Sequence, residues 1–111
     1  MIASDKTHTI VIAEDFSKYT GYRYKSQSAG SSGEEFREEF LLPSIKEYTF
    51  IKVDLNGVKN RILPSFLEEA FAGLARSKKW DLETFKKHIE IISDRTDYIE
   101  DIYIYIKNTQ K

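Results

Sequence analysis

The chain of 111 residues contains no cysteine, two prolines and two histidines. Without cysteine it can form no disulfide, it offers no thiolate to a metal ion, and it has no cysteine nucleophile. A zinc site needs three or four protein ligands, which the two distant histidines, His8 and His88, do not supply. Glycine patterns of the Walker and dinucleotide-binding types are also missing. The sequence therefore predicts no metal, no cofactor and no catalytic group.

A long apolar stretch and an excess of one charge are missing as well. The longest purely apolar run, Ile102–Ile106, is far shorter than the roughly 20 residues that span a bilayer. The 17 basic and 18 acidic residues give a formal net charge of −1, which argues against a basic arm for nucleic acid. The first residues are polar and unlike a signal peptide. We therefore expect a cytoplasmic, non-enzymatic protein that binds neither membrane nor nucleic acid.

Four segments have the composition or the alternation of β-strands. Three of them are β-branched and apolar, Thr9–Ala13, Phe50–Leu55 and His88–Ile92. The fourth, Gly21–Tyr24, alternates aromatic and polar residues, which favours a shorter strand. One domain is expected over residues 9–111, after a flexible N-terminus at residues 1–8.

Helical periodicity occupies most of the remaining chain. Apolar residues at helical spacing predict helices over Gly33–Leu42 and Phe66–Ser77, and Pro43 is expected to bend or end the first of them. A short helical turn is indicated within Trp80–Lys87. The last segment, Arg95–Lys107, has both a strand-like alternation and a helical stripe, and its charges favour a helix. The order of elements predicts an α/β fold, a small mixed sheet of about four strands with flanking helices.

The first predicted helix begins in a loop that has the features of an anion site. Ser32 and Glu35 have the Ser-x-x-Glu spacing of a capping box. Free amides at Gly30–Gly33 and nearby hydroxyls could hold a phosphate or a carboxylate, as helix starts do. Because nearly every capped helix offers this geometry, a plain cap is favoured. The candidate anion-binding residues are Arg23, Ser31, Ser32 and Gly33.

The second predicted helix begins at another serine with the same spacing, Ser65 with Glu68. Its ordinary role would be to cap the helix. The sharper alternative is phosphorylation, since a phosphate at a helix start faces the positive end of the helix dipole on an exposed turn. The physical pattern by itself favours the cap, and the two roles are compatible.

Two stretches of the chain, together with the segments before and between them, carry a family likeness. They are Ser32–Leu41 and Ser65–Leu74, with Gly21–Arg23 before them and Val53–Val58 between. In this order and spacing they resemble the bacterial STAS-like domain family of unknown function. The likeness extends from about Ile10 to Ile92.

The resemblance implies a regulatory module that binds a protein partner. STAS domains of anti-sigma-factor antagonists, distant relatives of this family, bind a histidine-kinase-like ATPase that phosphorylates a serine at a helix start. Ser65 is similar to that serine in position, although Leu63 and Pro64 precede it where the antagonists have an Asp-Ser-Ser-Gly turn. The resemblance thus implies Ser65 as phosphoacceptor and such an ATPase, or another regulatory protein, as partner. The competing class is a nucleotide-binding or anion-binding domain that uses the Gly30–Gly33 helix start. The partner-binding residues implied are Ser65, Phe66, Glu69 and Asn56, supported by the strand and loop Asp54–Val58.

Overall fold

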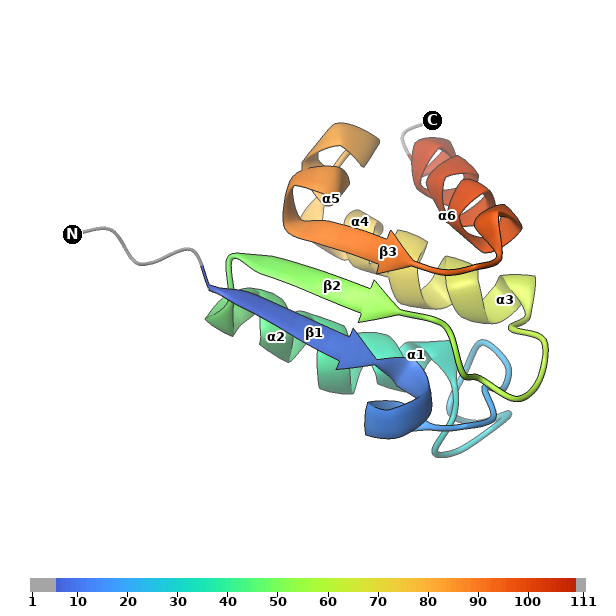
Figure 1. The fold of residues 1–111 in the computed structure, drawn as a ribbon. Helices are drawn as coiled ribbons and strands as arrows, with labels where there is room; N and C mark the ends of the chain where they lie inside the picture. Colours follow the sequence, from blue (N-terminus) through green and yellow to red (C-terminus); the bar gives the residue numbers. More distant parts are fainter. Residues whose placement is uncertain (1–5, 110–111) are drawn as a thin grey trace.

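The fold contains a sheet of three parallel strands (Figure 1). In this computed structural model, which describes residues 6–109, they are β1 (Thr7–Val11), β2 (Phe50–Asp54) and β3 (Ile89–Ile92), in the order β1-β2-β3. The expectation of a mixed sheet of about four strands is therefore corrected to a parallel sheet of three within the described residues. β1 also begins two residues earlier than expected, at Thr7, which pairs with Phe50. Residues 1–5, which make up most of the flexible N-terminus predicted at 1–8, lie outside the described residues.

The fourth predicted strand, Gly21–Tyr24, lies in an irregular loop. Its carbonyl groups have partners other than a sheet: Tyr22 accepts a hydrogen bond from the amide of Gly33, and Arg23 accepts one from Glu34. Residues 33 and 34 open the first long helix, where backbone amides lack partners within the helix. The segment therefore accepts hydrogen bonds from the start of the helix and does not pair as a strand.

Two long helices connect the three strands. Each is continuous and contains one π-helical turn, a feature found mostly as a single turn within α-helices. Pro43 was expected to bend or end the first helix, but it lies directly after the π-turn, as the second residue of α2, and the helix continues to Glu47. The first helix consists of α1 (Gly33–Phe36), η2 (Arg37–Leu41) and α2 (Leu42–Glu47), and the second of α3 (Pro64–Leu67), η3 (Glu68–Ala72) and α4 (Gly73–Lys78).

Three shorter elements complete the described fold. A π-helical turn, η1 (Ile12–Phe16), follows β1, and α5 (Leu82–His88) replaces the helical turn expected at Trp80–Lys87. Asp81 begins α5 by accepting a hydrogen bond from the amide of Thr84 at 2.8 Å. The ambiguous C-terminal segment is the helix α6 (Thr96–Asn108), whose buried side chains pack against α3 and η3.

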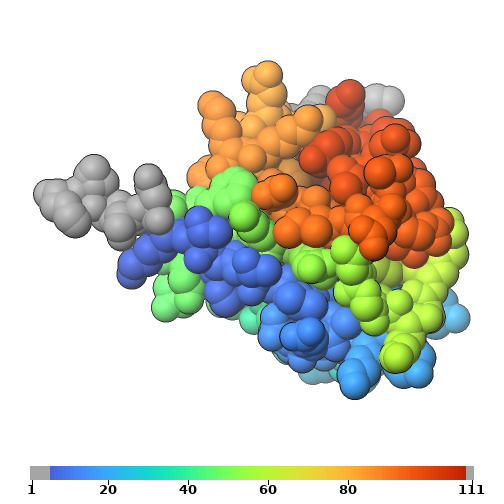
Figure 2. Space-filling view, in the orientation of Figure 1, coloured from blue at the N-terminus to red at the C-terminus, as the bar shows by residue number. Residues whose placement is uncertain are grey.

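Both long helices lie on the same face of the sheet (Figure 1). Right-handed crossovers between parallel strands in the order 1-2-3 place their helices on one side. Ile51 and Val53 of β2 point into the core on this side and are fully buried. On the other face Thr9, Lys52 and Glu90 stand beside one another in register and are exposed or half-buried, and Figure 2 shows atoms of all three strands at the surface. No helix within residues 6–109 has both the length and the apolar character needed to cross a membrane.

Candidate functional site

The start of α1 is closed by reciprocal hydrogen bonds between Ser32 and Glu35. The amide of Glu35 donates to the Ser32 hydroxyl oxygen at 3.1 Å, and the Ser32 hydroxyl donates to Glu35 Oε1 at 2.8 Å. The same carboxylate accepts from the amides of Gly30 and Ser32. These hydrogen bonds confirm the predicted capping box. Ser32 is fully buried. The place of an external anion is thus taken by a carboxylate of the chain itself.

The electrostatics of this carboxylate follow from its hydrogen bonds. Burial of Glu35 favours the neutral form, but donors from Ser32 and the amide of Gly30 outweigh this and lower the pKa of the carboxyl below its ordinary value. The next two amides of α1 donate to Tyr22 and Arg23, as described above. The helix start therefore has no free amide for a ligand, and the geometry disfavours the anion site predicted at Gly30–Gly33.

The other residues of that candidate site have partners or packing roles of their own. The side chain of Ser31 donates a long hydrogen bond of 3.4 Å to the carbonyl of Ser28. Gly33 lies so close to α3 that a Cβ atom there would come within 2.7 Å of the carbonyl oxygen of Phe66. Glycine is required at this position because the starts of α1 and α3 touch. The guanidinium of Arg23 bonds carboxylates of the second long helix and none of the candidate anion-site residues.

Arg23 belongs to an ion-pair network between the two long helices. Its guanidinium bonds Glu68 and, at 3.1 Å, Glu69. Glu69 also bonds Arg37, and Glu68 bonds Arg76 at 2.5 Å. Burial of Glu68 opposes ionisation, but the hydrogen bonds from Arg76 and Arg23 lower the pKa of its carboxyl. The network joins the loop to η2 of the first long helix and to η3 and α4 of the second, through side chains that are partly or largely removed from water.

The start of α3 is built differently from the start of α1. The helix begins at Pro64, and the residue at the cap position, Leu63, has no side-chain hydrogen bond to it. Ser65 is thus the second helical residue and not the cap, and the predicted capping box with Glu68 is wrong. Proline is favoured at the first helical position, where its missing amide and fixed φ suit the helix, and this moves the start one residue ahead of Ser65. The Ser65 hydroxyl is half-buried and makes no hydrogen bond within residues 6–109.

Two of the residues implied as partner-binding are turned inward. Phe66 is fully buried and packs against the rings of Phe16 and Phe36. Glu69 is 8% exposed, and its carboxylate forms ion pairs with Arg23 and Arg37. Asn56 stays half-exposed in the turn after β2, where its side chain accepts a hydrogen bond from the amide of Asp94 at 2.9 Å. Of the four implied residues, only Ser65 and Asn56 are accessible.

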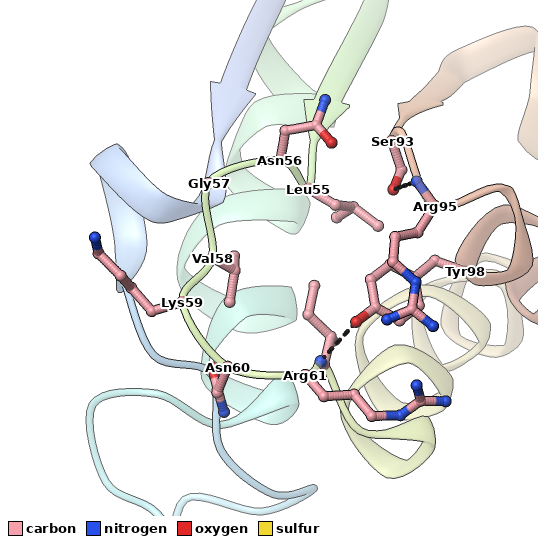
Figure 3. A pocket seen from close by; sticks show the side chains of 11 residues that line it. Leu55, Asn56, Gly57, Val58, Lys59, Asn60, Arg61, Ser93, Arg95 and Tyr98 are labelled. Carbon is pink, nitrogen blue, oxygen red and sulfur yellow. Dashed lines mark hydrogen bonds between the residues drawn. The ribbon is translucent and has the colours of Figure 1, made fainter.

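A pocket of about 300 Å³ opens at the carboxyl ends of β2 and β3 (Figure 3). We call it the strand-end pocket; it is lined by the loop 55–62 together with Ser93, Arg95 and Tyr98. Sequence reasoning missed its arginines, Arg61 and Arg95, although Arg61 lies in a charged segment directly after the Asn56-Gly57 turn. Gly57 allows that turn because its φ is +93°, in the region that favours glycine. Ligands of open α/β sheets typically bind at the carboxyl ends of the strands.

The chain matches the model of a known family. The model of the STAS-like domain of unknown function (DUF4325) matches residues 32–98, which include both long helices, β2 and β3. No curated protein and no solved structure matches the chain.

Proposed function

The chain belongs to the STAS-like domain family of unknown function, and from that premise we propose that it is a non-enzymatic regulatory module whose binding to a protein partner is switched by phosphorylation of Ser65. The family likeness supports a histidine-kinase-like ATPase as the kinase and partner.

The observation that carries this proposal is the state of the Ser65 side chain. Its hydroxyl is half-buried in the first turn of α3 and makes no hydrogen bond within residues 6–109. A hydroxyl without an intramolecular partner can be modified without breaking the fold. A phosphate at this position would add nearly two negative charges at the positive end of the helix dipole, where they are stabilised.

The contact surface differs from the one implied by the family likeness. Because Phe66 and Glu69 are buried, they stabilise the start of the second long helix from inside the fold and do not contact a partner. The accessible neighbours of Ser65 along the chain are Pro64, which is exposed, and the loop that contains Asn56. We place the partner surface on Ser65, Pro64 and this loop.

The switch works through charge and desolvation. A partner that covers the unmodified α3 start removes only a small, neutral hydroxyl from water, which costs much less than burying a charge. A phosphate at the same place brings a charge that a closely packed or acidic partner surface cannot solvate. Binding is therefore expected for the unmodified protein and loss of binding for the phosphorylated one.

The test is a pull-down from extracts of the native host, with the ATPase detected by mass spectrometry. Wild-type protein and Ser65→Ala are expected to recover the ATPase, and Ser65→Asp is expected to lose it. The matched control is Ser26→Asp, which adds the same charge to an exposed loop and should bind like wild type. Equal recovery by Ser65→Asp and Ser26→Asp would contradict the proposal.

A further inference from the structure

The strand-end pocket combines cations with apolar side chains and contains no acidic group. Its eleven lining residues include no aspartate or glutamate, although the whole chain has 18. Leu55 and Val58 point toward its centre, whereas the side chain of Lys59 extends outward, away from it (Figure 3). Apolar side chains that bury part of a ligand, together with polar groups that orient it, are features of small-molecule sites.

Two arginines lie on the same side of the pocket, beside Tyr98 (Figure 3). Arg61 is exposed and has no ion pair or hydrogen-bonding side-chain partner within residues 6–109. Arg95 pairs with Asp97 through Nε at 3.1 Å and Nη2 at 2.6 Å, and it stacks over the ring of Tyr98. The Arg61 guanidinium is therefore free to bind an anion, and Arg95 retains Nη1 for the same purpose.

Neutral donors also line the pocket. Tyr98 is 6% exposed, and its oxygen accepts a hydrogen bond from the amide of Ile62 at 2.9 Å. The structure gives its hydroxyl proton no acceptor within residues 6–109. The loop amides of Gly57, Val58, Asn60 and Arg61 likewise have no acceptor in that part of the chain.

We propose that the strand-end pocket binds a small organic phosphate, with its phosphate held by Arg61, Arg95 and the loop donors and its organic body on Leu55, Val58 and Tyr98. A phosphate carries several acceptor oxygens, which match the surplus of donors here. The apolar floor requires a body beyond the phosphate. The pocket shares the loop 55–62 with the proposed partner surface but does not include Ser65, so ligand binding can be tested separately from the phosphorylation switch.

The test is a two-dimensional NMR titration of the ¹⁵N-labelled full chain with adenosine monophosphate, inorganic phosphate and adenosine. The monophosphate should give saturable shifts at the amides of Gly57, Val58, Asn60 and Arg61. Inorganic phosphate, which lacks the body, and adenosine, which lacks the charge, should bind more weakly. Saturable shifts confined to other residues, or none at millimolar monophosphate, would overturn the proposal.

A matched pair of variants separates a built site from general charge attraction. Arg61→Gln and Lys25→Gln each remove one positive charge from an exposed loop. Arg61→Gln should weaken binding of the monophosphate by about tenfold, as expected for loss of a hydrogen bond to a charged group. Lys25→Gln should leave the affinity nearly unchanged, because Lys25 does not line the pocket. An equal loss in both variants would overturn the proposal. Ser65→Ala should bind like wild type, so a failed switch and a failed pocket give different results.

Discussion

At the start of α1, Ser32 is fully buried and exchanges hydrogen bonds with Glu35. At the start of α3, Ser65 stands in the same Ser-x-x-Glu pattern, yet its hydroxyl is half-buried and has no partner within residues 6–109. Glu68 turns instead to Arg23 and Arg76. The difference teaches that the pattern alone does not decide the role of the serine; what precedes it does. One helix start is closed by its own side chains, and the other is left available.

The largest expected effect breaks the closed helix start. Glu35→Ala should lower the free energy of unfolding by about 2–3 kcal/mol, because the Ser32 hydroxyl and the amides of Gly30 and Ser32 lose a charged acceptor. Urea denaturation measures this change. Glu34→Ala is the matched control, since that carboxylate accepts a single bond from Lys25. A loss in Glu35→Ala no greater than in the control would contradict the account of the α1 start.

The direct comparison removes the hydroxyl at each helix start. Ser32→Ala should cost about 1–2 kcal/mol, as loss of a buried cap does. Ser65→Ala should cost less than about 0.5 kcal/mol, because it removes no hydrogen bond. Both values come from denaturation under the same conditions. A similar cost at the two positions would mean that Ser65 caps its helix after all.

An effect of intermediate size is expected on the stability of the protein in acid, and it tests the contribution of the Glu35 charge. The pKa of Glu35 is lowered in the folded protein, so the unfolded chain binds its proton first as the pH falls. The stabilisation is complete above the ordinary glutamate pKa of about 4.3 and is lost as the pH falls below it. Stability measured between neutral and acidic pH should fall less steeply in Glu35→Gln than in wild type. Identical pH profiles would contradict this assignment.

The smallest expected effect concerns the available helix start. Ser65→Asp should raise the free energy of unfolding by about 0.3–1 kcal/mol, because a negative charge in the first turn favours the helix dipole. Ser65→Asn, of the same shape without the charge, should show no such gain. The gain should shrink when salt is added, since the side chain is partly exposed to solvent. Destabilisation by Ser65→Asp would show that the site does not accept a charge.

Much of the fold could be predicted from local patterns. The three β-branched segments formed strands, and helical spacing located both long helices and α6 to within a few residues. The strand predicted at Gly21–Tyr24 is wrong, because carbonyl groups of this segment accept hydrogen bonds from amides of α1. The alternation of aromatic and polar residues cannot reveal that pairing. The parallel sheet of three strands then followed from the loss of that fourth strand.

The site was less predictable, for two physical reasons. Pro64 moved the helix start ahead of Ser65, so a serine with capping spacing became the second helical residue. Phe66 and Glu69 were expected at a contact surface, but their phase on the helix turns them toward the core and the arginines. The strand-end pocket depends on residues from the β2–α3 loop and from α6, which only the tertiary structure brings together.

The most direct test of the contrast between the two serines is phosphosite mapping of the protein recovered from its native host. Mass spectrometry of the wild-type protein and of Ser65→Ala would locate any phosphate to a residue. The account predicts phosphate on Ser65, none on the buried Ser32, and loss of the modification in Ser65→Ala. Phosphate on Ser32, phosphate retained in Ser65→Ala, or an unmodified Ser65 across growth and stress conditions would contradict it.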